Sequence, residues 1–183
     1  MIMRLLGAAA LVAVMGFGAG VGYAEADHDL ATMKGDLGID LHVFDHAMAG
    51  SLRGFVIWGS VNEQTGASEL VMRRDGQDVK SIFKKTGNVF GGVVQHDAET
   101  GTISTDIAFV GLNRETNVYS FIVNGKSVTA EVMAEDFVSN HFIKPTYKLT
   151  MPDGKSVSFK FDGKACYNYS LHIITMMIAA VTH

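Results

Sequence analysis

The sequence predicts a mainly β protein, in which an antiparallel meander of about 8–10 strands forms a barrel or a barrel-like sandwich. Turn-forming residues recur roughly every 8–12 residues from Gly54 onward, a spacing typical of sandwiches and barrels. Between the turns, apolar residues mostly alternate with polar ones. Such alternation is typical of antiparallel strands that have one face on a core and the other in water.

The first 26 residues have the order of a secretory signal peptide. A short basic start ends at Arg4, residues 5–17 are apolar or small, and cleavage motifs of small residues end at Ala24 and Ala26. The apolar run is too short and too rich in Gly and Ala to span a bilayer. We therefore expect residues 1–26 to be a cleaved leader and residues 27–183 to form one periplasmic or secreted domain, with no stable membrane span after cleavage.

The segment that follows the leader fits two kinds of structure. Its apolar residues lie on one helical stripe, but from position 37 they also alternate as in a strand. Gly35 and Gly38 each cost a helix about 1 kcal/mol relative to Ala. We predict a short helix near residues 29–34 and a strand over residues 37–44, and residues 37–50 stay open between helix and strand. The stripe consists of Leu30, Met33, Leu37, Leu41, Phe44, Met48 and Leu52.

The strands of the meander are expected between glycine-containing turns. Asn124-Gly125 is the strongest turn signal, because a type I′ hairpin turn needs positive φ at both central residues. Alternation is clearest over residues 102–109, 143–151 and 156–161, and Pro145 is expected at an edge or a strand start. The turn signals are Thr65-Gly66, Asp75-Gly76, Thr86-Gly87-Asn88, Thr100-Gly101, Asn124-Gly125, Pro152-Asp153-Gly154 and Asp162-Gly163.

The C-terminal segment again supports two interpretations. Residues 166–173 alternate, and residues 173–181 are apolar on both faces, as in a closing barrel strand or a buried terminal helix. We favour the barrel strand, although residues 171–182 stay open between the two. Cys166, the single cysteine, excludes an intramolecular disulfide, and we predict that it is at least partly buried.

Charge and motifs exclude several classes of function. The formal net charge is -4, and no run of Lys or Arg indicates an anionic surface as partner. We therefore expect no nucleic-acid partner. The sequence has no dinucleotide, Walker, metalloprotease or nucleophile-elbow motif, and we expect no cofactor and assign no catalytic residue.

His42 and His46 are the one candidate metal pair. On a helix, their spacing would put both imidazoles on one face, where they could bind copper or zinc. On a strand, the two residues would lie roughly 13 Å apart, too far to share an ion. The predicted strand over residues 37–44 therefore favours two ordinary surface histidines.

Aromatic residues on predicted strands are the candidate ligand-binding residues. An eight-stranded barrel either fills its interior with such side chains or leaves room for one small ligand. Our leading hypothesis is an exported, non-enzymatic barrel-like protein that binds a small apolar or amphipathic molecule, as lipocalin-like carriers do, although no lipocalin motif is present. The candidates are Trp58, Phe109, Tyr119, Phe121, Tyr147 and Tyr169.

Two other hypotheses belong to different classes. A structural or interaction protein of the envelope would dock on a partner, or on a second copy of itself, through the apolar residues 173–181 or an exposed edge strand. A barrel-type isomerase, cyclase or hydrolase would collect polar groups at one mouth of the barrel. The sequence names no such set of groups, because residues that converge from different strands are not adjacent in the chain.

Overall fold

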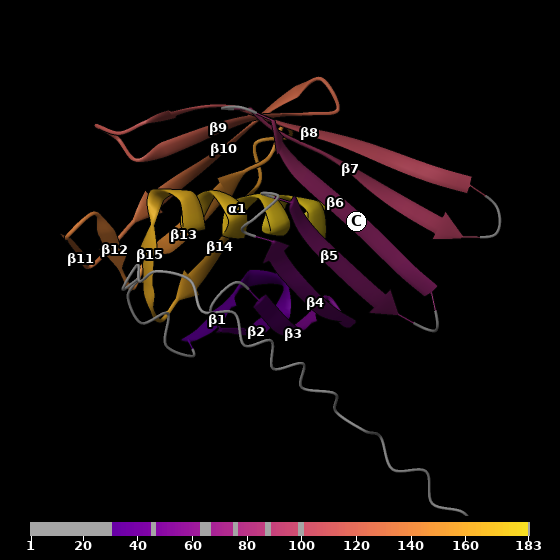
Figure 1. The fold of residues 1–183 in the computed structure, drawn as a ribbon, viewed down its shortest axis with the longest axis horizontal. Coiled ribbons are helices and arrows are strands. Elements are labelled where there is room, and N and C mark those ends of the chain that lie inside the picture. Colours follow the sequence, from indigo (N-terminus) through magenta and orange to yellow (C-terminus); the bar gives the residue numbers. More distant parts are fainter. Residues whose placement is uncertain are drawn as a thin grey trace, which may run out of the picture.

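The structure, a computed structural model, describes residues 31–44, 47–62, 67–74, 77–86, 89–98 and 101–182. Within them the protein has a large antiparallel sheet, a small sheet of three strands and one C-terminal helix, α1 (Tyr167–Val181) (Figure 1). The predicted mainly antiparallel β fold is confirmed. The predicted leader, residues 1–26, lies outside the described residues.

The strands of the large sheet follow one another in chain order from β1 to β10, and β13 and β14 complete it. The sheet closes on itself, because β1 pairs with β2 along one edge and with β14 along the other. We call this closed sheet the strand ring. Its strands are β1 (Ala31–Gly35), β2 (Ile39–Phe44), β3 (Ala47–Leu52), β4 (Phe55–Asn62), β5 (Ala67–Arg74), β6 (Gln77–Thr86), β7 (Val89–Ala98), β8 (Gly101–Asn113), β9 (Val118–Val123), β10 (Lys126–Met133), β13 (Thr146–Thr150) and β14 (Ser156–Phe161).

The small sheet lies beside the start of α1. It pairs β11 (Asp136–Val138) with β12 (His141–Ile143), and β12 with β15 (Lys164–Cys166). The helix begins at the residue that follows β15. The described residues contain strands β1 to β15, because three strands precede Arg53 and three short strands form the small sheet. This number exceeds the about 8–10 strands that the sequence predicted.

The predicted short helix near residues 29–34 is wrong over its described part, because Ala31–Gly35 is strand β1. Met33 pairs with Leu41 on one side and Phe161 on the other. The helix-like spacing arises because a single 3₁₀ turn, η1 (Asp36–Gly38), separates two short strands that each bury alternate residues. The predicted strand over residues 37–44 is confirmed from Ile39 onward as β2.

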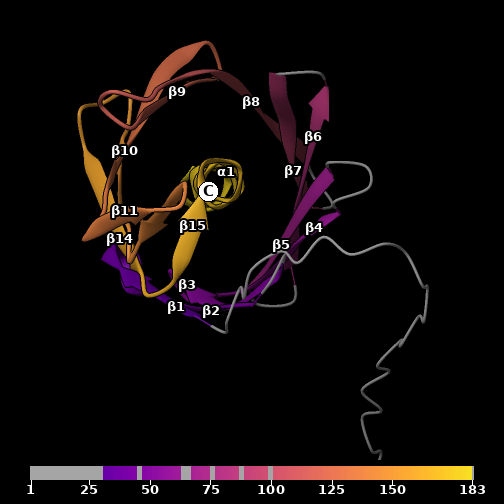
Figure 2. The same cartoon turned by 60° about the vertical axis from the view of Figure 1, so that its left-hand side comes forward.

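The favoured strand for the C-terminal segment is also wrong, because residues 167–181 form α1. The ring is already closed by the β1–β14 pair, so no open edge remains there for another strand. A helix satisfies its own backbone hydrogen bonds, and one that is apolar all round is stable only when buried on every side. Figure 2 shows α1 surrounded by the strand ring, and Ile173, Ile174 and Ile178 are fully buried.

Packing between the ring and α1 forms one continuous core. Alternation along β13 and β14 buries Tyr147, Leu149, Phe159 and Phe161, as the sequence predicted. Gly59 in β4 lets the helix come close, because a Cβ atom there would lie 3.1 Å from the Met176 sulfur.

Three smaller predictions of the sequence are confirmed. Asn124 and Gly125 have φ values of 49° and 74°, so both central residues of the β9–β10 turn have the positive φ of a type I′ turn. Pro145 directly precedes β13, where its missing N–H removes no ladder hydrogen bond from the strand. The single cysteine, Cys166, is half-buried, as predicted, and its sulfur accepts a 3.4 Å hydrogen bond from the backbone N–H of Tyr169 at the start of α1.

Candidate functional site

The sequence-predicted aromatic residues mostly lie inside the strand ring. Tyr119, Phe121 and Tyr147 are buried on its inner face, and Tyr169 is buried on α1. Phe109 is half-buried, with its ring centroid 5.5 Å from that of Phe121 and 6.3 Å from that of Tyr119. The structure therefore brings Phe109, Tyr119 and Phe121 together, but as packing around α1.

Trp58 points away from this group. Its side chain is 39% exposed on the outer face of β4. The Arg73 guanidinium carbon lies 5.4 Å from the centroid of its ring, within the range of a cation–π contact. Trp58 is thus a surface residue, separated from the buried aromatic side chains by the sheet itself.

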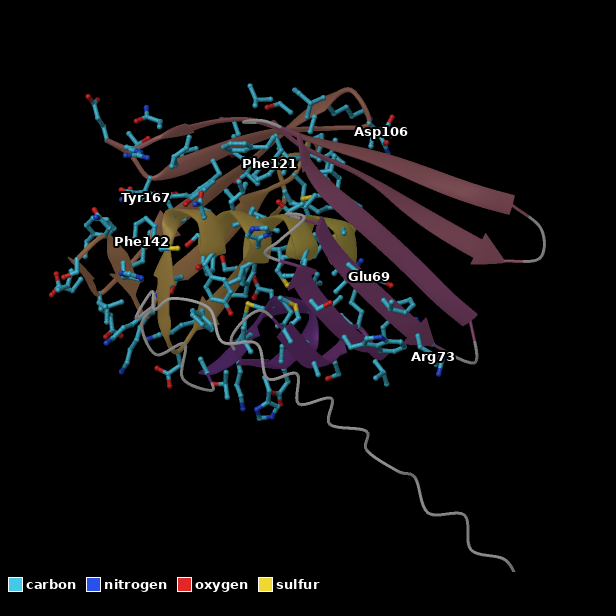
Figure 3. All side chains as sticks on the ribbon, in the orientation of Figure 1. Glu69, Arg73, Asp106, Phe121, Phe142 and Tyr167 are labelled. Carbon is cyan, nitrogen blue, oxygen red and sulfur yellow. The ribbon has the colours of Figure 1, made fainter. Side chains whose placement is uncertain are left out.

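The buried tyrosine hydroxyls form hydrogen bonds with residues at the start of α1. The Tyr119 hydroxyl donates to the Tyr167 carbonyl oxygen over 2.9 Å, and the Tyr147 and Ser170 hydroxyls are 3.0 Å apart. Burial raises the pKa of Tyr119 and of Tyr147 well above the usual 10.0, so both phenols stay neutral. These contacts hold the helix in place. Figure 3 shows Tyr167 and Phe142 at this end of α1.

Only one member of the candidate metal pair lies within the described residues. His42 is exposed on β2, and His46 lies outside the described residues. Among the residues that the structure describes, no group of three or more His, Cys, Asp or Glu residues could hold a metal ion.

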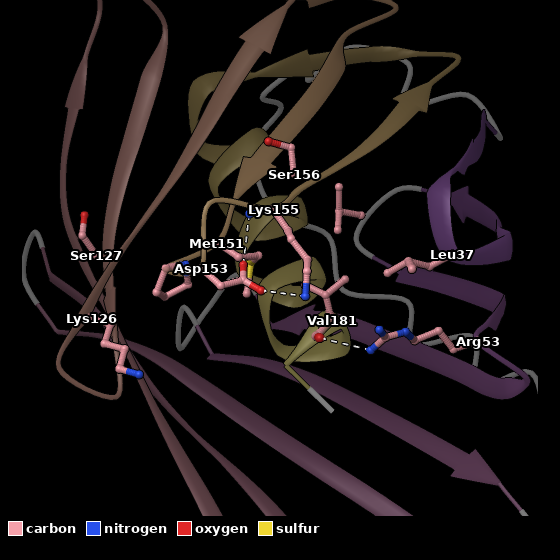
Figure 4. Close-up of a pocket in the computed structure, with 11 residues that line it drawn as sticks. Leu37, Arg53, Lys126, Ser127, Met151, Asp153, Lys155, Ser156 and Val181 are labelled. Atoms are coloured by element: carbon pink, nitrogen blue, oxygen red, sulfur yellow. Dashed lines mark hydrogen bonds and ion pairs between the residues drawn. The ribbon is translucent and has the colours of Figure 1, made fainter.

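A cleft of about 820 Å³ lies at the opposite end of α1, where the helix ends (Figure 4). Its walls come from turns that are far apart in the sequence and from the last turn of the helix. The lining residues are Leu37, Arg53, Lys126, Ser127, Met151, Pro152, Asp153, Lys155, Ser156, Val157 and Val181.

The charged residues of the cleft differ in their partners. The Lys155 ammonium lies 3.0 Å from the Asp153 carboxylate, whose pKa is lowered mainly by this hydrogen bond. Arg53 and Lys126 form no ion pair with any residue that the structure describes. Two positive charges therefore remain without an acidic partner beside an apolar wall that includes Leu37, Met151 and Val181.

Arg53 is fixed from two directions. Its backbone N–H donates to the Leu37 carbonyl oxygen over 3.1 Å. Its Nη1 donates to the Val181 carbonyl oxygen over 3.3 Å, at the end of α1 where unpaired carbonyls give a partial negative charge. One of the five guanidinium N–H groups is used in this contact, which orients the planar group at the cleft.

Leu37 and Arg53 both have positive φ, 59° and 51°. Each stands directly before a glycine with positive φ, in the tight turns β1–β2 and β3–β4. Such a turn favours Asn, Asp or Gly at this position, whereas other residues pay a steric cost of about 1 kcal/mol. Two residues that line the cleft are therefore held in a backbone conformation that their side chains disfavour.

Sequence reasoning missed this cleft, because its residues come from separate turns and only the fold brings them together. Arg53-Gly54 was a partial signal, since an X-Gly pair between apolar runs marks a hairpin turn that an arginine does not favour.

Compared with known protein families, with curated proteins and with solved structures, the chain matches none. Among the residues that the structure describes, no helix is both long enough and apolar enough to cross a membrane.

Proposed function

We propose that this protein is an exported, non-enzymatic binding protein that holds one small amphipathic molecule in the cleft at the C-terminal end of α1. The observation that carries the proposal is the lining of the cleft, in which an apolar wall adjoins cations without acidic partners. Its volume of about 820 Å³ lies within the usual range of small-molecule sites, roughly 300–1,000 Å³.

Because α1 occupies the interior of the ring, we place the proposed site at the end of the ring, beside the last turn of the helix. In a barrel that carries a small ligand, the interior has to leave room for it. Here the helix and the aromatic side chains share one packed core, which includes Tyr119, Tyr147 and Ile174. The cleft has both charged and apolar lining residues, so an amphipathic ligand agrees better with it than a purely apolar ligand does.

The composition of the cleft also favours binding over catalysis. Its described lining contains Ser127 and Ser156 but neither histidine nor cysteine. A serine nucleophile needs a general base within hydrogen-bond reach. Among the hydrogen bonds of the described residues, neither serine is bonded to Asp153, Lys126 or Lys155, the lining groups that could serve as one. We therefore rank the enzyme hypothesis below the binding protein.

Calorimetric titration of the exported chain with 12-carbon amphiphiles, each below its micelle concentration, tests the proposed function. The probes are dodecanoate, dodecyl maltoside and dodecyltrimethylammonium. Saturable binding of at least one probe with a stoichiometry near one supports the proposal. The absence of saturable binding for all three would overturn it.

One observation keeps an interaction protein as the second candidate function. Strand β11 pairs with β12 alone among the described strands, and all three of its residues are exposed, Phe137 by 44% and Val138 by 50%. An exposed strand edge is a template for pairing with another chain. Burial of α1 argues against docking through residues 173–181. Sedimentation of the chain and of a Phe137→Lys variant tests self-association through β11, which predicts a dimer that the variant abolishes.

A further inference from the structure

We propose that the molecule bound in the cleft carries an anionic head group, held by Arg53 and Lys126, with its apolar tail against the wall formed by Leu37, Met151 and Val157. The inference rests on the proposed function and assigns the chemical class of its ligand. A carboxylate, a sulfate and a phosphate share the required chemistry, because each offers several oxygen acceptors and a negative charge.

The charges that line the cleft favour an anionic ligand. Three cations and one carboxylate line it, and the carboxylate of Asp153 is paired with Lys155. Arg53 and Lys126 therefore contribute two positive charges without an ion pair among the described residues. In Figure 4 these two side chains lie on either side of the end of α1. An anionic head would offset part of this positive charge, whereas a cationic head would be repelled.

The backbone of Arg53 supplies an independent argument. At φ 51° before Gly54, the turn itself would be better served by asparagine. Backbone strain of this kind persists where the side chain is needed, and it gathers at ligand sites. The hydrogen bond to the Val181 carbonyl oxygen uses one N–H group and leaves the others for an anion. Arginine is also the residue that binds carboxylate and phosphate with two parallel hydrogen bonds.

The apolar wall provides the second half of the specificity. Leu37, Met151 and Val157 are incompletely buried and packed against the edge of the core. An alkyl tail would cover them and gain about 0.8 kcal/mol for each CH₂ group that it removes from water. A small inorganic anion gains nothing from this wall, so the proposal predicts that free phosphate binds far more weakly than an amphiphile with the same head.

The decisive experiment is a titration with probes that share a 12-carbon tail and differ in the head. Dodecanoate and dodecyl phosphate carry the proposed charge, dodecyltrimethylammonium carries the opposite charge, and dodecyl maltoside carries none. Inorganic phosphate supplies the head without the tail. We expect both anionic amphiphiles to bind at least about tenfold more tightly than the neutral and cationic ones, and to weaken as salt is added.

Two variants and a matched control locate the head group. Arg53→Asn and Lys126→Gln should each weaken dodecanoate binding by about tenfold or more, the loss expected for one charge-assisted hydrogen bond. Lys164→Gln removes an exposed lysine on β15, at the other end of α1, and should leave binding unchanged. Because asparagine suits the turn, Arg53→Asn should keep its thermal unfolding temperature, which separates lost binding from lost folding.

The outcomes separate the two proposals. Equal binding of the cationic and anionic probes, or dodecanoate binding that neither variant weakens, would overturn the anionic head while leaving the amphipathic binding protein in place. Tight binding of inorganic phosphate alone would overturn the role of the apolar wall. If no amphiphile binds to the unmodified chain, the proposed function itself fails.

Discussion

The two ends of α1 lie in different surroundings. At the N-terminal end, the rings of Phe137 and Phe142 lie 5.5 and 5.0 Å from that of Tyr167, and the Arg114 guanidinium carbon lies 5.0 Å from the same ring. At the C-terminal end, the last turn faces a cleft, and the Val181 carbonyl oxygen accepts one hydrogen bond from Arg53.

The difference lies in how polar groups are satisfied. At the N-terminal end, the buried hydroxyls of Tyr119, Tyr147 and Ser170 all have partners within the protein. At the C-terminal end, Arg53 and Lys126 have no ion pair among the described residues. Satisfied buried groups stabilise a fold, whereas charges without partners beside a cleft suit a ligand. We infer that the first end mainly supports stability and the second mainly supports binding.

The largest expected effect comes from removing the element that both ends share. A chain that ends at Ser170 lacks buried residues such as Ile173, Ile174 and Ile178. Each such side chain contributes about 1.5–3 kcal/mol when buried, and a domain is stable by only about 5–15 kcal/mol in total. We expect the shortened chain to lose cooperative unfolding in circular dichroism. A shortened chain that melts cooperatively at the original temperature would show that α1 is dispensable.

Removing one hydroxyl group should lower the free energy of unfolding more at the N-terminal end of α1 than at the C-terminal end. Tyr147→Phe leaves the buried Ser170 hydroxyl without this partner and should lower the free energy of unfolding by about 1–3 kcal/mol. Ser156→Ala, at the exposed Thr150–Ser156 contact beside the cleft, should change it by less than about 0.5 kcal/mol. Urea unfolding measures both changes. In the Tyr147→Phe/Ser170→Ala double variant, the loss should be smaller than the sum of the two single losses.

Alkaline pH should destabilise the protein through the buried tyrosines at the N-terminal end of α1. Burial raises the pKa of Tyr119 and of Tyr147 above 10.0, where an unfolded tyrosine ionises. The stability that these groups contribute is therefore fully present below pH 10 and is lost as the pH rises further. We expect the thermal unfolding temperature to fall above pH 10, and to fall less in Tyr147→Phe. Ionisation of both phenols near pH 10 without any loss of stability would contradict this account.

The smallest expected effect on stability is at the cleft. Lys126 is exposed and has no ion pair among the described residues, so Lys126→Gln should change the free energy of unfolding by less than about 0.5 kcal/mol. Urea unfolding of this variant beside Lys164→Gln provides the measurement. A loss of more than 1 kcal/mol would mean that Lys126 supports the fold.

Local patterns predicted the regular part of the fold. Alternation identified β13 and β14, and Asn124-Gly125 identified the β9–β10 turn, because both depend on neighbours in the chain. The same patterns failed for residues 31–35 and 167–181. In the first segment, a tight turn between two short strands gave the apolar residues a spacing like that of a helix. In the second, the choice between strand and helix depended on whether the sheet still had an open edge.

The candidate site was less predictable than the fold. Aromatic side chains such as Tyr119 and Tyr147 were correctly placed on strands, but the sequence did not reveal that α1 would pack against them. The cleft draws Leu37 and Arg53 from two turns and Lys126 from the start of β10, and long-range closure of the ring is what assembles them. Only the unfavourable arginine before Gly54 was visible in the sequence.

The most direct test of the division between the two ends is a map of the amide chemical shifts of the protein during titration with dodecanoate. We predict that the shift changes centre on the cleft, at Leu37, Arg53, Lys126 and Val181, and that the amides of Tyr147 and Ser170 stay unchanged. Shift changes that centre on Tyr147 and Ser170, with none at Arg53, would contradict the account by placing the ligand at the end of α1 that we assign to stability.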